Sequence, residues 1–122
     1  MANEALNIYK QTDSDYIRGI ETPHGRIKIL YETIIENIEN IIDHHPKTDF
    51  KSLGKCLNAL RILSSSLDME KGKELAENLN ELYFYCSNKV KAYLENKDEK
   101  KLEEVSNIIN GLLDAWKEIQ EK

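Results

Sequence analysis

The stretch LEEVSNIINGLLDAWKEI, residues 102–119, carries the clearest structural pattern in the chain. Its large apolar residues recur at alternating steps of three and four: Leu102, Val105, Ile109, Leu112, Trp116 and Ile119. Residues three and four positions apart lie on one face of an α-helix, so this spacing predicts an amphipathic helix with a single apolar stripe. Such a helix needs other helices to cover its stripe.

Three stretches upstream repeat the pattern. The first stripe comprises Ile27, Leu30, Ile34, Ile38 and Ile41; the second Phe50, Leu53, Leu57, Leu60 and Leu67, widened by Cys56 and Leu63; the third Leu75, Leu79, Leu82, Tyr83, Cys86, Val90 and Tyr93. The flanking turn and cap residues predict helices near 23–43, 49–67, 70–95 and 98–120. Short connections make successive helices antiparallel. We therefore predict an all-α fold: an antiparallel up-down four-helix bundle over residues 22–122, preceded by a short, partly flexible N-terminal capping segment, residues 1–21.

Composition narrows the class of protein. A chain of 122 residues fits one domain with one core. Its net charge is -5, and Lys and Arg alternate with Glu, which argues against a nucleic-acid partner. We find no signal-like N-terminus and no run of about 18 apolar residues, so we expect no membrane insertion and a cytoplasmic protein. Cys56 and Cys86 lack disulfide or zinc-site spacing and are predicted to be reduced, buried thiols.

The residues that catalysis or metal binding requires are not grouped in this sequence. We find no nucleophile beside a base and no Gly-rich phosphate loop. Glu21 and His24 form one Glu-x-x-His match, whereas di-iron bundles use two, and a helix start at Pro23 keeps the pair off an interior face. The neighbours His44 and His45 precede a proline in an expected turn. We expect no enzyme activity, no metal and no cofactor.

Several apolar residues fall outside the predicted core stripes. On a helical wheel, Ile29 and Ile62 lie opposite their stripes, while Phe84 and Tyr85 lie more than about 100° from the centre of the third stripe. Single exposed apolar residues are common, but two adjacent aromatic rings are typical of a binding surface. We interpret these positions as a groove for a protein client.

The N-terminal segment carries apolar residues of its own, Leu6, Ile8 and Tyr9. A short apolar segment tethered to a bundle can cover exposed apolar surface when no client is bound. We predict this covering role for the three residues; a disordered tail is the alternative.

Several motifs resemble one known family, the flagellar export chaperones known as FliS. They are Ile8-Tyr9-Lys10-Gln11-Thr12, Ile20-Glu21-Thr22-Pro23, Leu30-Tyr31-Glu32, Ser66-Leu67-Asp68-Met69-Glu70-Lys71-Gly72, Leu79 to Leu82-Tyr83 with Tyr85, and Ala115-Trp116. The resemblance covers nearly the whole chain, and the block from Leu67 to Tyr85 is its most specific part.

The resemblance implies a cytosolic chaperone that binds the C-terminal segment of flagellin, prevents premature polymerisation and hands it to a flagellar export gate component. It also implies that Ile8 and Tyr9 are self-capping residues that the client displaces. Tyr31 and Tyr83 are interpreted as core or as the floor of the client groove.

A helical adaptor that self-associates through the same outward aromatics is the alternative function. The client-binding hypothesis predicts that replacing Phe84 and Tyr85 together with Ser weakens client binding and leaves helicity intact.

Overall fold

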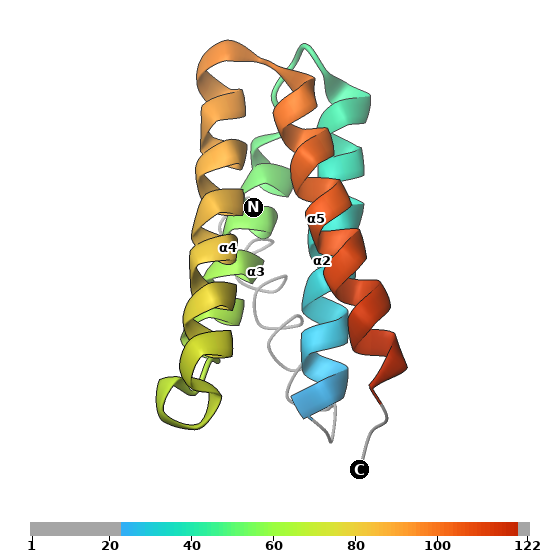
Figure 1. Ribbon diagram of the computed structural model, residues 1–122. Coiled ribbons are helices and arrows are strands. Elements are labelled where there is room, and N and C mark those ends of the chain that lie inside the picture. The colour runs from blue at the N-terminus through green and yellow to red at the C-terminus, as the bar shows by residue number, and fades with distance from the viewer. Residues whose placement is uncertain (1–22, 120–122) are drawn as a thin grey trace, which may run out of the picture.

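The computed structural model describes residues 23–119 of the chain (Figure 1). This range folds into four α-helices and contains no strand: α2 (Pro23–His44), α3 (Phe50–Ser65), α4 (Met69–Asn96) and α5 (Glu99–Glu118). The bounds lie within about two residues of the predicted ones, and the predicted all-α four-helix bundle is confirmed. The predicted capping segment, with Leu6, Ile8 and Tyr9, lies outside the described residues.

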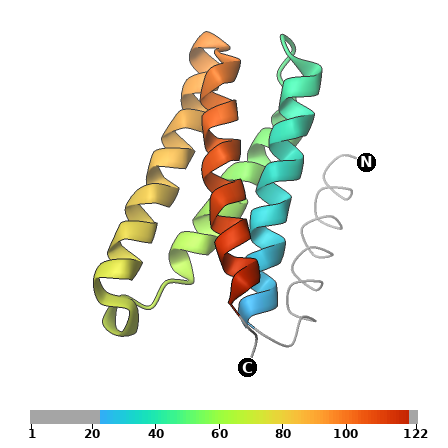
Figure 2. The ribbon, with the colours of Figure 1, turned by 45° about the vertical axis from the view of Figure 1, so that its right-hand side comes forward.

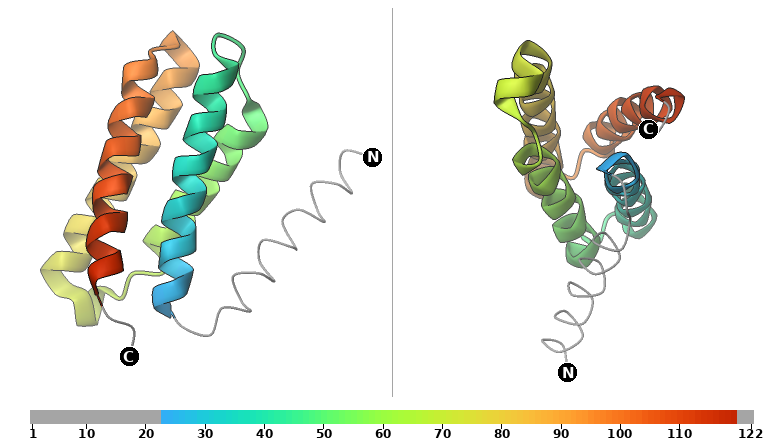
Figure 3. Two further views of the ribbon diagram at one scale, coloured as in Figure 1. Left: turned by 90° about the vertical axis from the view of Figure 1, so that its right-hand side faces the viewer. Right: turned by 90° about the horizontal axis from the view of Figure 1, so that it is seen from below.

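The helices form an antiparallel ring in which each packs against two neighbours. Helix α2 packs against α3 and α5, and α4 packs against the same two helices. The diagonal pairs, α2 with α4 and α3 with α5, have no close backbone approach. Seen from below, α3 and α4 lie on one side of the bundle and α2 and α5 on the other (Figure 3).

Aspartates begin the last three helices. Asp49 accepts a hydrogen bond from the Ser52 amide, Asp68 accepts bonds from the Glu70 and Lys71 amides, and Asp98 accepts one from the Lys100 amide. A carboxylate at this position satisfies amide groups that have no partner inside the helix. These three caps fix where the helices restart after the short turns.

The core follows the predicted stripes. Its fully buried side chains come from all four helices: Ile34, Ile38, Ile41, Cys56, Leu60, Leu63, Cys86, Val90, Tyr93, Leu102, Val105 and Ile109. Cys56 and Cys86 are free thiols, and burial raises the pKa of Cys56 to about 12 and that of Cys86 to about 11.

Within residues 23–119, no helix is long and apolar enough to cross a membrane.

Three residues predicted on core stripes are exposed instead. Phe50, Leu75 and Ile119 have 68%, 66% and 52% of their surface exposed. Phe50 begins α3, Leu75 lies near the start of α4, and Ile119 follows α5, so each lies at a helix end where little of the neighbouring helices covers it.

The stripe of α5 also departs from its predicted register. Leu113 is buried and Leu112 only half-buried. A strict three-four spacing repeats every 3.5 residues on average, whereas a straight helix repeats every 3.6, so the stripe drifts around the helix.

Helix α4 contains a kink in its first turns. Lys73 has φ 49° and ψ −124°, which breaks the helical path after the turn that Asp68 caps. Just before it, a Cβ at Gly72 would lie 2.7 Å from the Cβ of Ala76, so the chain there tolerates no side chain without movement. The kink and the two small residues shape the lower end of the bundle.

The upper end of the bundle, where the α2–α3 and α4–α5 turns meet, is closed by a polar cluster. The Tyr93 hydroxyl shares a 2.8 Å hydrogen bond with His45 Nδ1, and His45 Nε2 lies 3.4 Å from a Glu99 carboxylate oxygen. The Lys97 ammonium lies 5.3 Å from the centre of the Tyr93 ring. This cluster joins both turns to the buried part of α4.

Candidate binding surfaces at the end and on the side of the bundle

The lower end of the bundle contains an open, mainly apolar cavity of about 690 Å³, here called the end cavity. It lies where α2 begins, α3 ends, α4 begins and α5 ends, and the lower ends of α4 and α5 diverge there (Figure 2). Its apolar wall comes from all four helices: Ile27, Leu30, Ile62, Leu63, Leu67, Leu75, Ala76, Leu79 and Trp116. Its volume lies in the range of about 300–1,000 Å³ typical of ligand sites.

Two buried tyrosines form part of the end cavity's wall, whose other polar residues are Arg26, Ser66 and Asp68. Tyr31 and Tyr83 are each 2% exposed, and their hydroxyl oxygens lie 2.7 Å apart, which links the diagonal helices α2 and α4. Burial raises the pKa of Tyr31, although its bond with Tyr83 partly offsets this; burial and the bond to Tyr31 both raise the pKa of Tyr83. Both hydroxyls are therefore neutral near pH 7.

A reciprocal contact between His24 and Trp116 closes one side of the end cavity. The Trp116 indole Nε1 donates to the His24 carbonyl at 2.8 Å, and His24 Nε2 lies 2.9 Å from the Trp116 carbonyl. The two rings stack with centres 5.0 Å apart, and Trp116 meets Tyr31 edge-on. The contact holds the start of α2 against the end of α5.

Within residues 23–119, no group of three or more His, Cys, Asp or Glu side chains is arranged to hold a metal ion.

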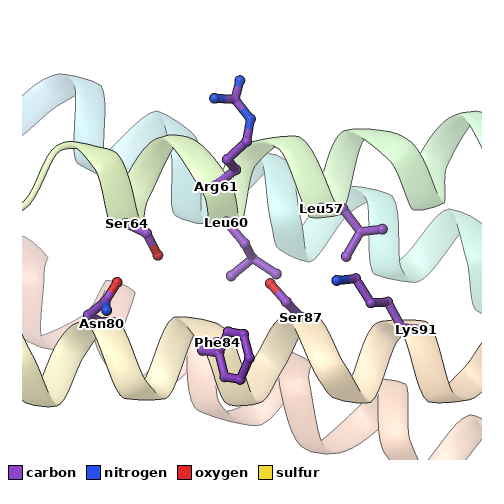
Figure 4. Close-up of a pocket in the computed structure, with 8 residues that line it drawn as sticks. All are labelled: Leu57, Leu60, Arg61, Ser64, Asn80, Phe84, Ser87 and Lys91. Atoms are coloured by element: carbon purple, nitrogen blue, oxygen red, sulfur yellow. The ribbon is translucent and has the colours of Figure 1, made fainter.

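The outer side of the α3–α4 pair carries a second hollow, of about 420 Å³, here called the side groove. Figure 4 shows its lining: Leu57, Leu60, Arg61 and Ser64 from α3, and Asn80, Phe84, Ser87 and Lys91 from α4. Leu60 points toward α4, while the Lys91 ammonium extends toward Leu57. The side groove and the end cavity share no lining residue.

The six predicted client-binding residues do not form one surface. Ile62, Tyr31 and Tyr83 line the end cavity, and Phe84 lines the side groove with 66% of its surface exposed. Ile62 was expected to face outward, but the open end of the bundle turns that side of α3 into a cavity wall.

Tyr85 and Ile29 line neither hollow. Tyr85 lies on the α5 side of α4, where its hydroxyl donates to the Glu104 carboxylate at 2.7 and 2.9 Å. Phe84 and Tyr85 therefore lie beside different neighbours, Phe84 next to α3 and Tyr85 next to α5, because adjacent helical residues point about 100° apart. Ile29 is half-buried on α2, and its carbonyl accepts the Thr33 hydroxyl at 2.8 Å.

Sequence reasoning missed Leu75 and Trp116 as surface-forming residues. Both were predicted on core stripes, and both line the end cavity. Their spacing alone does not distinguish a residue that meets a neighbouring helix from one that faces an open end.

Comparison with known proteins agrees with the motifs along the whole chain. The family model described as "Flagellar protein FliS" matches residues 2–122. A flagellar secretion chaperone FliS of Salmonella typhimurium is 39% identical, covering 96% of this chain and 90% of that protein. The Campylobacter jejuni protein of the same name is 34% identical over 96% of this chain and 91% of its own, and that of Vibrio cholerae is 28% identical over 94% and 88%. The chain belongs to the family of flagellar protein FliS.

Proposed function

We propose that this protein is a cytoplasmic export chaperone that holds the disordered C-terminal segment of flagellin in the end cavity. Membership of a family whose curated relatives are named flagellar secretion chaperones supports the role. The observation that carries the choice of site is the cavity itself: an open, apolar hollow of about 690 Å³ whose rim includes Leu75, 66% exposed. A soluble domain rarely leaves such a surface without a partner.

The end cavity suits an amphipathic client segment. Apolar side chains one helical turn apart would enter between the diverging helices, which is how helices bind in apolar grooves. Each large apolar side chain that is buried contributes about 1.5–3 kcal/mol. Ordering a disordered segment costs about 2–5 kcal/mol or more, so several anchors are required.

When the end cavity holds the client's apolar side chains, the surface through which flagellin polymerises is hidden. Release at a flagellar export gate component would then deliver the client. Every step is binding and release. The role therefore needs no catalytic residue and no cofactor.

The test is a calorimetric titration of the full chain with a peptide covering the C-terminal segment of flagellin from the same organism. We expect one-to-one binding with a negative heat-capacity change, and a loss of about tenfold in affinity for Leu75→Ser. Phe50→Ser is the matched control, because Phe50 is 68% exposed and does not line the end cavity. Absence of binding, together with a concentration-dependent mass for the chain alone, would favour a self-associating adaptor.

A second variant distinguishes the two possible binding sites for the client, the end cavity and the surface that carries Phe84 and Tyr85. The wheel-based hypothesis expects the double variant F84S/Y85S to weaken flagellin binding. The end cavity proposal expects that variant to bind like the wild type, since neither residue lines the cavity. Circular dichroism on both variants checks that helicity is retained.

A further inference from the structure

The side groove between α3 and α4 is separate from the end cavity, the proposed binding site of the client. It opens on the outward side of these helices, and none of its lining residues lines the end cavity. A client segment confined to the end cavity would not contact the residues that line this groove. A surface that stays open while the client is bound is available to a different partner.

The side groove continues into an exposed apolar stripe along α3. Phe84 on α4 is 66% exposed beside half-buried Leu57. Phe50 lies seven residues before Leu57, which places it on the same face of α3, and it is 68% exposed. Between them, a Cβ at Gly54 would find no atom within 4 Å, so the stripe has a flat, open section. Two exposed aromatic rings bordering such a section suit an incoming helix.

The charge of the side groove is opposite to that of the whole protein. The chain carries 22 acidic and 17 basic residues, a net charge of -5. The two ionised residues that line the groove are nevertheless Arg61 and Lys91. Neither forms an ion pair within the described part of the chain; the Arg61 guanidinium donates to the Asn58 side chain instead, at 2.8 Å.

Cationic side chains that form no ion pair of their own, beside an apolar floor, attract carboxylates. In Figure 4 Lys91 extends along the groove toward Leu57, while Arg61 points away from α4 on the α3 rim. The two charges therefore border the floor formed by Leu57, Leu60 and Phe84 on different sides. This arrangement fits a helix whose carboxylates flank an apolar stripe.

We propose that the side groove binds an acidic amphipathic helix of a second protein, distinct from the flagellin client. The apolar stripe of that helix packs against Leu57, Phe84 and Phe50, and its flanking carboxylates pair with Arg61 and Lys91. A nucleic acid is disfavoured by the two-cation rim on an acidic protein. The groove thus gives the chaperone a surface by which it is recognised while it carries its client.

The experiment measures fluorescence anisotropy of a labelled model peptide against the full chain. The probe is a designed helix of about 18 residues with Leu and Phe at i, i+3, i+4 and i+7 and Glu on both flanks. A peptide with Lys in place of every Glu is the charge control. We expect the acidic peptide to bind at one site, more tightly at low salt, and the Lys peptide to bind at least about tenfold more weakly.

Protein variants locate the site. The double variant R61E/K91E and the single variant F84S should each weaken binding of the acidic peptide by about tenfold or more. The variant K47E/K100E makes the same change in net charge at two exposed lysines outside the groove and should keep affinity within about twofold. L75S, which acts on the end cavity, should leave this peptide's affinity unchanged.

Each of four results would overturn the proposal. Equal binding of the acidic and Lys peptides, or an equal loss in K47E/K100E, would show that charge in the groove is irrelevant. Displacement of the acidic peptide by the flagellin peptide would assign the groove to the client. A dimer of the chain that R61E/K91E dissociates would assign it to a second copy. Failure of flagellin binding itself appears separately, in the calorimetric titration of the unaltered chain with the flagellin peptide.

Discussion

The hydroxyl groups of Tyr31 and Tyr83 form a buried polar contact in the wall of the end cavity, and each is the other's hydrogen-bond partner. Tyr83→Phe leaves the Tyr31 hydroxyl without its partner, so we expect a loss of about 1–2 kcal/mol in the free energy of unfolding. The double variant Y31F/Y83F removes both hydroxyls and should lose less than the sum of the two single variants. Urea unfolding followed by circular dichroism gives the three values.

Additive losses would contradict this coupling and would mean that water in the end cavity already satisfies the hydroxyls. Tyr85→Phe is a suitable control. Its hydroxyl bonds an exposed carboxylate on α5, and we expect a change within about 0.5 kcal/mol.

The two thiols make stability sensitive to alkaline pH. Burial raises the pKa of Cys56 to about 12 and of Cys86 to about 11, above the ordinary value of 9.0. A thiol whose pKa is higher in the folded than in the unfolded protein favours the folded state as long as both states keep the proton. This contribution to the free energy of unfolding is fully present below the unfolded pKa, about pH 9, and is lost as the pH rises through the folded values of about 11 and 12. C56A/C86A should unfold more easily at pH 7 yet lose less additional stability between pH 9 and 11.

Thermal unfolding at several pH values measures that slope. Equal slopes for the wild type and C56A/C86A would show that other groups, such as the buried tyrosines, dominate the alkaline loss.

At the scale of the element, the kink in α4 places a lysine in an unfavourable backbone conformation. Lys73 has φ 49° and ψ −124°, a region that side chains with a Cβ rarely occupy and that costs about 1–3 kcal/mol. Lys73→Gly removes this cost while adding about 0.5–1 kcal/mol of chain entropy, so we expect a net gain of about 1 kcal/mol.

Lys71→Gly is the matched control, because Lys71 lies in the helical turn just before the kink and glycine there should destabilise by about 0.5–1 kcal/mol. The melting temperature should rise for the first variant and fall for the second. A fall for both would mean that α4 follows an unbroken helical path in solution.

The same helix illustrates how far sequence patterns reach. Apolar spacing predicted α4 and its buried face, because Tyr83, Cys86, Val90 and Tyr93 recur at steps of three and four. The kink was not predictable, since lysine carries no preference for positive φ. Leu75 fits the spacing but follows the kink and faces an open end, so periodicity alone assigned it to the core.

The candidate surfaces were harder to predict than the helices. Wheel geometry correctly predicted that Phe84 and Tyr85 are exposed. It could not assign them to surfaces, because that requires knowing that α3 flanks one side of α4 and α5 the other. The end cavity arises because the lower ends of α4 and α5 diverge (Figure 2), and this depends on packing angles that short-range spacing does not contain.

At the scale of the whole molecule, the N-terminal segment is predicted to compete with the client. Leu6, Ile8 and Tyr9 lie outside the described residues, so the prediction rests on their sequence and on the open cavity. If they cover the end cavity, the variant L6S/I8S/Y9S exposes it more often, and the flagellin peptide should bind about three- to tenfold more tightly. Calorimetry on the full-length variant measures this.

A matched change elsewhere in the same segment, Ile17→Ser with Ile20→Ser, should have a smaller effect. Unchanged affinity in L6S/I8S/Y9S would contradict the covering role. Weaker binding would mean that these residues help to hold the client.

The two ends of the bundle have different structural roles. At the upper end, His45, Tyr93 and Glu99 tie the α2–α3 and α4–α5 turns together. At the lower end, the end cavity is open, and the Tyr31–Tyr83 hydrogen bond joins the diagonal helices in its wall. Residues at the rim of the cavity, such as Leu75, can therefore vary with the client while the contacts that hold the upper end together stay unchanged.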